Sequence, residues 1–260
     1  MRMTHELSLT ALVRSRMRVG LRHPATYAAA LLAMAAGAIG AMVPTGFRAL
    51  EHGAGLGSGL HYGLLGAAAI APVVTVLLVS ALVAGDDDIG VRREHALAGV
   101  GTEIGTIAST VAAGCVAVAT LGLAAVTGMA VGAADALRQG TPLLTSVGIT
   151  PVAVCVAVCC WFAVVAGGLS AATRRSLAVS GLLLGGGLLF FVALMASRDA
   201  THVRSVLELT PYAPFWSLAY SGDSSLLALP MSAGAIAAGL IGWPVVTVAA
   251  GAVASRRPVG

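Results

Sequence analysis

The side chains that could do chemistry in this sequence are few, and they lie between long apolar runs. Glu51, His52 and His61 surround a Gly-rich stretch, residues 53–59, and are the candidates for acid–base chemistry on a lipid. They would serve an integral-membrane lipid enzyme only if they converged at the membrane surface. All fifteen residues counted as Lys or Arg are Arg. Schiff-base chemistry and the phosphate-binding Lys of a P-loop are therefore excluded.

The cysteines raise the question of a metal site. Cys155 and Cys159 are four residues apart, so they share one face of a helix and could bind a soft metal. No nearby pattern of His, Asp or Met accompanies them, and the sequence has no His-Glu-x-x-His motif. The sequence therefore predicts no metal site, and these thiols are expected to pack as small apolar side chains.

The composition places the chain in a membrane. Hydrophobic residues make up 58% of it, charged residues 10%, and the mean hydropathy is +0.93. A soluble domain carries about 25% charged residues, so this chain cannot cover a water-facing surface. Disorder, a collagen-like fibre, a secreted disulfide scaffold and a nucleic-acid-binding protein are excluded as main interpretations, and no nucleic-acid partner is expected.

Uncharged runs predict the spans, because a helix needs about 20 apolar residues to cross the hydrocarbon core. Strand-like alternation is absent, so we expect an all-α integral membrane protein with one transmembrane domain over residues 1–260. The third and sixth runs exceed a straight crossing, so they should tilt or continue beyond the membrane. The six runs are 25–43, 62–84, 104–134, 147–169, 176–197 and 226–254.

The distribution of arginines predicts the orientation. Eleven of the fifteen fall on one side of a six-span arrangement, which places both termini in the cytoplasm by the positive-inside rule. The first run is longer than the core of a signal peptide and follows a long charged segment, so we expect it to be retained as a span. The Arg-only, Ala- and Gly-rich composition favours a GC-rich bacterium, and hence a multi-pass protein of the bacterial plasma membrane.

The interiors of the six runs contain no Asp, Glu, Lys, Arg or His. Ion-coupled transporters, proton pumps and voltage sensors need such groups at membrane depth. Any uphill transport must therefore draw its energy from another polypeptide. Hydroxyl residues such as Thr75 and Ser80 either join helices by hydrogen bonds or line a path for an amphipathic substrate.

Two glycine pairs place small residues on one helical face. Gly128 and Gly132 lie in the third run, and Gly181 and Gly185 lie in the fifth. Such pairs allow close approach of another helix, either within the bundle or at a dimer contact or moving gate.

Residues 6–23 predict a helix at the membrane surface before the first span. Arg14, Arg18 and Arg22 form a basic stripe beside an apolar side, so the arginines can meet anionic headgroups. Arg16 falls on the opposite side from this stripe, and His23-Pro24 should end the helix.

Residues 85–103 are the most charged segment of the chain and separate the second and third runs. Asp86, Asp87 and Asp88 could cap a short helix over residues 89–100. About nineteen residues are more than a connection needs, so we expect a docking element for a soluble partner.

On the other side of the membrane, residues 201–225 predict a short helical hairpin with aromatics at headgroup depth. Its marker residues are Pro211, Tyr212, Pro214 and Trp216.

The order of these parts resembles the type-2 permeases of ATP-binding-cassette exporters. That family has an N-terminal interfacial helix, six spans with both ends inside, a coupling helix in the first cytoplasmic loop and a re-entrant hairpin before the last span. The most specific match runs from Arg92-Arg93-Glu94-His95 to Gly101-Thr102-Glu103, and Thr210-Pro211 is similar to the family's Pro-containing segment.

The resemblance implies a subunit that is not an enzyme on its own. Two ATPase subunits, which hold the ATP and Mg, would drive alternating access of two permease chains, identical or different, in the lipid bilayer. The coupling residues would be Asp88, Arg92, Arg93, Glu94 and His95. The cargo would be a lipophilic or amphipathic drug, antibiotic or lipid, as in efflux-based antibiotic resistance. The alternative is a non-transporting immunity or assembly protein that docks its partner through the same loop.

Overall fold

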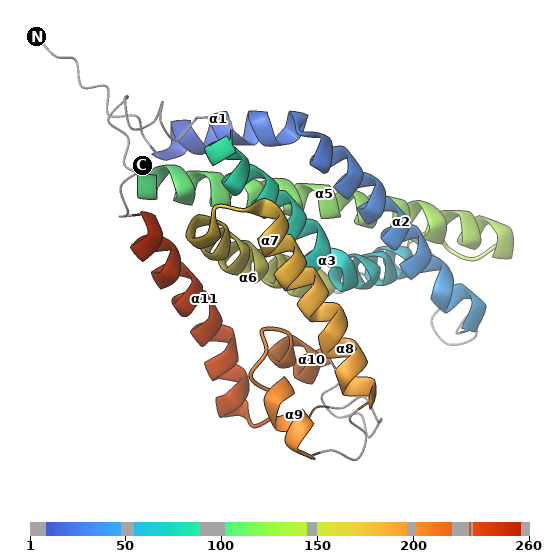
Figure 1. The fold of residues 1–260 in the computed structure, drawn as a ribbon. Helices are drawn as coiled ribbons and strands as arrows, with labels where there is room; N and C mark the ends of the chain where they lie inside the picture. The colour runs from blue at the N-terminus through green and yellow to red at the C-terminus, as the bar shows by residue number, and fades with distance from the viewer. Residues whose placement is uncertain are drawn as a thin grey trace, which may run out of the picture.

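The computed structural model describes residues 9–47, 55–88, 102–144, 150–196, 201–219, 229 and 231–255. Every regular element in these ranges is helical, so the predicted all-α class is confirmed (Figure 1). Some of the residues with predicted roles lie outside the described residues, among them Arg92, Arg93, Glu94 and His95.

Six helical segments of the described chain are long and apolar enough to cross a membrane. The fifth of them is a continuous path through α7, the π-helix η1 and α8. The described residues also form three shorter helices: α1 (Leu9–Arg22), α9 (Thr201–Leu207) and α10 (Ala213–Ala219). The long elements are α2 (Pro24–Phe47), α3 (Leu56–Asp88), α5 (Thr102–Gln139), α6 (Thr150–Thr173), α7 (Ser176–Ser180) with η1 (Gly181–Gly185) and α8 (Gly186–Ala196), and α11 (Ala233–Ser255).

The helix boundaries depart from the uncharged runs where local hydrogen bonds decide them. The sixth span was predicted from residue 226, but α11 begins at Ala233, because the Ser232 hydroxyl accepts a hydrogen bond from the Ala235 backbone N–H at 3.1 Å and caps the helix. α5 has 38 residues, about 57 Å at 1.5 Å per residue, so it continues beyond the hydrocarbon core as expected.

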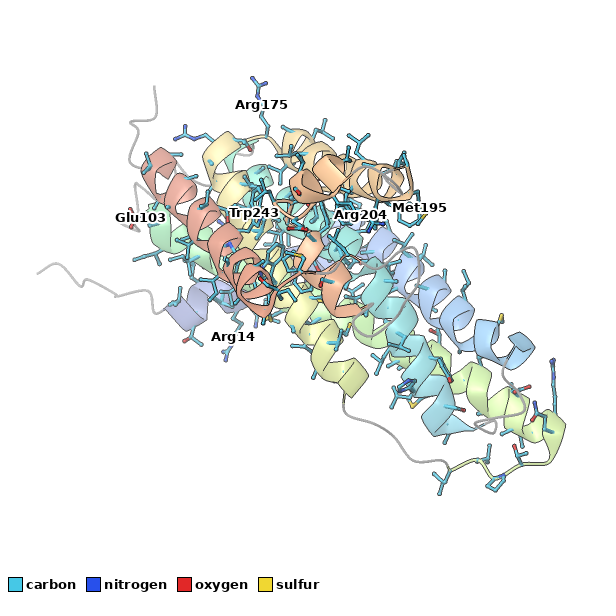
Figure 2. The ribbon with its side chains drawn as sticks, turned by 90° about the horizontal axis from the view of Figure 1, so that it is seen from below. Arg14, Glu103, Arg175, Met195, Arg204 and Trp243 are labelled. Atoms are coloured by element: carbon cyan, nitrogen blue, oxygen red, sulfur yellow. The ribbon has the colours of Figure 1, made fainter. Side chains whose placement is uncertain are left out.

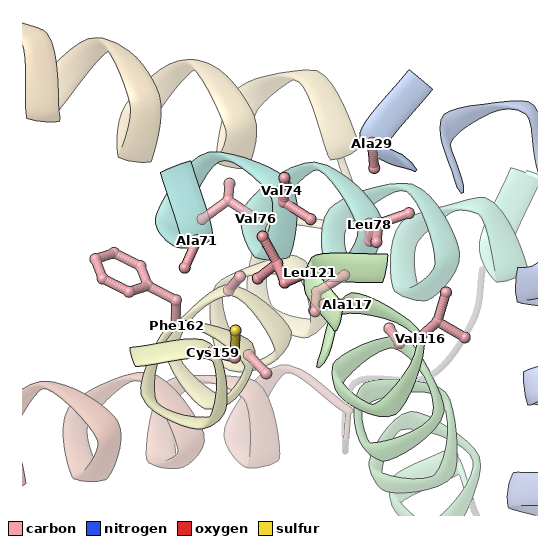
Figure 3. Packing of buried hydrophobic residues seen from close by; sticks show 14 of the residues in the cluster. Ala29, Ala71, Val74, Val76, Leu78, Val116, Ala117, Leu121, Cys159 and Phe162 are labelled. Carbon is pink, nitrogen blue, oxygen red and sulfur yellow. The ribbon is translucent and has the colours of Figure 1, made fainter. Parts of the chain in front are cut away.

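α3 is the central helix of the bundle. In its most apolar window 56% of the residues are buried, against 11% for α11, which lies at the outside (Figure 1). α3 contacts α2, α5, α6 and α7. Its Val74 and Leu78 pack with Leu121 of α5 and Phe162 of α6 in the main core (Figure 3).

Glycines bring the backbones of α3 and α5 into direct contact. A Cβ at Gly128 would lie 2.5 Å from the Gly59 carbonyl oxygen, and one at Gly132 would lie 2.8 Å from the Gly59 Cα. A Cβ at Gly63 would lie 2.8 Å from the Gly128 Cα. The predicted small face of Gly128 and Gly132 is therefore used within the bundle. We call this set, Gly59, Gly63, Gly128 and Gly132, the α3–α5 glycine contact.

α2 approaches α3 in the same way. A Cβ at Gly66 would lie 2.3 Å from the Ala36 carbonyl oxygen, and one at Gly40 would lie 2.5 Å from the Tyr62 carbonyl oxygen. α2 also meets α5, where the Thr127 hydroxyl donates to the Met34 carbonyl at 3.2 Å. α2, α3 and α5 thus form one tightly packed group.

α11 is held mainly by α6. The Trp161 indole N–H donates to the Leu240 carbonyl at 2.8 Å, and a Cβ at Gly168 would lie 2.5 Å from the Thr247 backbone. α11 makes only slight contact with α5. The bundle therefore has a compact part built on α3 and a more open part built on α6.

The α3–α5 glycine contact predicts a stability difference between two glycines of the same helix. Gly128→Ala should lower the free energy of unfolding by about 1–3 kcal/mol, because backbone atoms of α3 occupy the space of the new methyl group. Gly122→Ala places the same methyl group in open space and should cause no loss. Thermal unfolding of the detergent-solubilised variants measures the difference, and equal melting temperatures for the two would contradict the packing.

Candidate functional site

α1 ends where the sequence predicts. The His23 Nδ1 accepts a hydrogen bond from the Ala25 backbone N–H at 3.2 Å, and Pro24 is the first residue of α2. Proline suits this position because its missing N–H has no partner in the first helical turn. The Thr26 hydroxyl donates to the Gly20 carbonyl at 2.6 Å and ties the two helices together.

The two faces of α1 have different environments. Arg14, Arg18 and Arg22 are exposed, as the basic stripe requires. The buried face consists of Leu12, Arg16 and Gly20, and α1 packs chiefly against α5. A Cβ at Gly20 would lie 3.0 Å from Leu82 of α3 and 3.4 Å from Val116 of α5.

Arg16 is a buried residue of α1 that the sequence pattern did not identify as one. The sequence places it away from the basic stripe, and in the structure it is only 9% exposed and belongs to the buried face of α1. The four-residue spacing of Leu12, Arg16 and Gly20 was the available clue, since residues four apart share one helical face.

Several charged residues gather at one end of the bundle. Arg14, Glu103 and Arg175 lie toward this end, away from the far end of α5 (Figure 2). Arg174 follows α6 with a left-handed φ of 56°, and its guanidinium donates to the Ala254 carbonyl in the last turn of α11 at 3.3 Å. We call this region the Arg-rich end. It comprises α1, the start of α5, and the ends of α6 and α11.

The charged segment, residues 85–103, joins the two helices of the glycine contact along the sequence, and its described residues belong to those helices. α3 ends at Asp88 and α5 begins at Thr102. Asp86, Asp87 and Asp88 belong to the last turn of α3, so their backbone is helical. The helix over residues 89–100 that they were expected to cap is not among the described residues, so the capping stays a prediction. Residues 89–101 lie outside the described residues.

α9 and α10 form two short helices before α11, and their connection faces the bundle. The Tyr212 hydroxyl donates to the Leu183 carbonyl in η1. Burial raises the pKa of Tyr212 to about 12, so the phenol keeps the proton that it donates. Phe215 stacks edge-on against Trp161 at a centroid distance of 5.0 Å. Tyr212 and Phe215 thus pack on the main core.

Further contacts fix the hairpin on α11. The Trp243 indole N–H donates to the Leu209 carbonyl at 3.1 Å, and Pro214 lies so close to Gly239 that a Cβ there would be 2.5 Å from its ring. Pro211 lies in the turn between the two short helices. Trp216 belongs to α10, and its side chain lies outside the described part.

The second glycine pair has a different environment from the first. Gly181 and Gly185 begin and end the π-helix η1, and nothing lies within 4 Å of a Cβ at either position. Leu182, next to them, is 62% exposed. This face is open in the single chain, whereas Gly128 and Gly132 are covered by α3.

The candidates for metal and acid–base chemistry do not converge among the described residues. No group of three His, Cys, Asp or Glu side chains in that part of the chain could hold a metal ion. Cys155 and Cys159 are buried in the main core, and His61 packs edge-on against Tyr62. Glu51 and His52 lie outside the described residues.

No protein-family model matches this chain, and a comparison with curated proteins also found no match.

The buried hydroxyl of the hairpin predicts a measurable contribution to stability. Tyr212→Phe should lower the free energy of unfolding by about 1 kcal/mol, because the hydrogen bond from the Tyr212 hydroxyl to the Leu183 carbonyl is lost. Tyr27→Phe is the control, since Tyr27 is 61% exposed on α2. Thermal unfolding in detergent measures both, and an unchanged melting temperature for Tyr212→Phe would show that the bond contributes nothing.

The buried face of α1 also leads to a testable prediction. Arg16→Ala should loosen α1, because the buried stem of Arg16 packs in the α1–α5 contact. Arg18→Ala removes an exposed Arg from the same helix and should not. A spin label on the exposed Ser15 reports the mobility of α1. Equal mobility of the spin label in the two variants would show that Arg16 does not hold α1 against α5.

Proposed function

We propose that this chain is the transmembrane permease subunit of an ATP-driven exporter, powered by a separate ATPase and paired with a second permease chain. The observation that carries the proposal is the position of the charged segment. It joins α3 and α5, the two helices whose backbones touch at the α3–α5 glycine contact. A push on that segment from the cytoplasm would reach both helices at once, because neither can slide past the other without separating the glycines.

Other features support the same assignment. Six apolar segments span the bundle, α1 lies at the Arg-rich end with its basic stripe exposed, and two short helices precede the last span. In the proposal, α1 is the interfacial helix, residues 85–103 couple to the ATPase, and the α9–α10 hairpin is the re-entrant element on the outer side. The Arg-rich end then faces the cytoplasm, following the positive-inside rule.

The cargo in this proposal is lipophilic or amphipathic. The interiors of the uncharged runs carry no ionisable residue that could bind a coupling ion, so ATP hydrolysis on the partner subunit is the energy source. Alternating access would come from movement of the α2–α3–α5 group relative to the second permease chain. The open face at Gly181 and Gly185 is available for that chain or for a gate.

The proposal predicts the effect of charge reversal in the coupling segment. Arg92→Glu with Arg93→Glu should abolish substrate-stimulated ATP hydrolysis, because the reversed charges no longer fit the ATPase surface. The measurement is co-purification of the tagged chain in mild detergent, with mass spectrometry of its partners and ATPase assays of the complex. The expected partner is a soluble protein with a Walker A motif, one per permease.

The matched control is Arg256→Glu with Arg257→Glu, which reverses two charges on the same side of the membrane outside the coupling segment. This control should retain the partner and its stimulated hydrolysis. A chain that purifies alone, or with a partner that lacks ATPase motifs, would overturn the proposal and favour the immunity or assembly protein.

A further inference from the structure

A cavity of about 280 Å³ lies between α5, α6 and α11. It exists because α6 packs against both neighbours while α5 and α11 hardly meet. Small residues line it, among them Gly167 of α6 and Gly251 of α11. Both glycines lie at close helix contacts, since a Cβ at Gly167 would lie 2.5 Å from the Thr110 Oγ1 and one at Gly251 would lie 3.0 Å from the Gly168 carbonyl oxygen. The cavity therefore follows from the way the three helices pack, in the more open part of the bundle.

The polarity of the cavity changes along its length. Its Glu103 lies in the first turn of α5 at the Arg-rich end, and Thr106 and Thr110 follow one turn apart on the same face. Val111, Val164 and Val248 surround the deeper part and are 46%, 38% and 51% exposed, so this part opens sideways between the helices. One end is thus at the membrane surface and the other is in the hydrocarbon core.

This gradient selects an amphipathic ligand with a positive head. Glu103 is the one charged residue among the described residues that line the cavity, so a cation is the complementary head group. The hydroxyl of Thr106, one turn deeper on α5, can also accept a hydrogen bond from an amine that lies at Glu103. Pockets for drug-sized ligands have volumes of about 300–1,000 Å³, and this cavity lies at the lower limit, so it suits a single alkyl chain rather than a two-chain lipid.

We propose that this cavity binds a single-chain amphipathic amine, which enters sideways from the membrane leaflet at the Arg-rich end. The amine lies at Glu103, and the alkyl chain lies between Val111, Val164 and Val248. As a statement of cargo class the inference rests on the proposed function; as a binding site it can be tested without the ATPase.

The test is photolabelling of the full-length chain in phosphatidylcholine nanodiscs. The probe is dodecylamine with a diazirine on its chain, and dodecanol with the same diazirine is the neutral match. Mass spectrometry should find the amine label on the cavity segments of α5, α6 and α11, and unlabelled dodecyltrimethylammonium should compete for it. Labelling spread evenly over the lipid-facing helices would overturn the site.

Two variants with matched controls separate the head from the chain. Glu103→Gln should weaken competition by the cation about tenfold while leaving labelling by the alcohol unchanged, which also reports that the cavity is intact. Asp135→Asn, at the other end of α5, is its control. Ala252→Phe fills the cavity and should remove labelling by both probes, whereas Val253→Phe, 61% exposed beside it, should not.

The outcomes distinguish this inference from the proposed function. Labelling by amine and alcohol alike, insensitive to Glu103→Gln, would show a site for an acyl chain of the bilayer and overturn the amine. Specific amine binding to a chain that associates with no ATPase would keep the site and overturn export. A complex whose ATPase is stimulated by the amine in the parent and not in Ala252→Phe would support both.

Discussion

Direct contact between helix backbones is the constraint on which this structure depends. Lipid chains are as apolar as the side chains that they cover, so burial of apolar area gives little drive for helices to associate in a bilayer. What remains is van der Waals contact and hydrogen bonding, and both improve as helices approach. Gly59 and Gly63 on α3, opposite Gly128 and Gly132 on α5, bring the two axes as close as their backbones permit. The same device at Gly40 and Gly66 adds α2.

The rest of the bundle is joined by polar side chains on a looser frame. Ser80 of α3 and Ser180 of α7 share a hydrogen bond of 2.7 Å, and the indoles of Trp161 and Trp243 bond to backbone carbonyls across helices. Such bonds contribute about 0.6 kcal/mol each in membrane proteins. α6 and α11 also meet closely, since a Cβ at Gly168 would lie 2.5 Å from the Thr247 backbone, but α5 and α11 hardly meet, and the cavity lies between them.

Composition and run length were enough to predict six spans and an all-helical fold, because a bilayer leaves the chain few other ways to satisfy its backbone. They did not predict which helices pair. Gly128 with Gly132 and Gly181 with Gly185 have the same spacing, yet α3 covers the first pair and the second is open. Spacing specifies a face, whereas the partner depends on the whole bundle. The burial of Arg16 could not be predicted for the same reason, since it follows from the packing of α1 against α5. The cavity depends on three helices distant in sequence and has no local pattern.

Under the proposed function, this division between tight and loose packing has a mechanical consequence. A rigid pair such as α3 and α5 transmits displacement from the segment that connects its ends, but transport also needs a part that yields. The path through α7, η1 and α8 meets that need. A π-helix already departs from the regular ladder, and Gly185, Gly186 and Gly187 stand at its junction with α8. There the Tyr212 hydroxyl holds the Leu183 carbonyl. The hairpin is thereby attached to the most deformable point of the fifth span and, through Trp243, to α11. Movement of α8 would therefore carry the hairpin and α11 with it, and with them the wall of the cavity that faces α5.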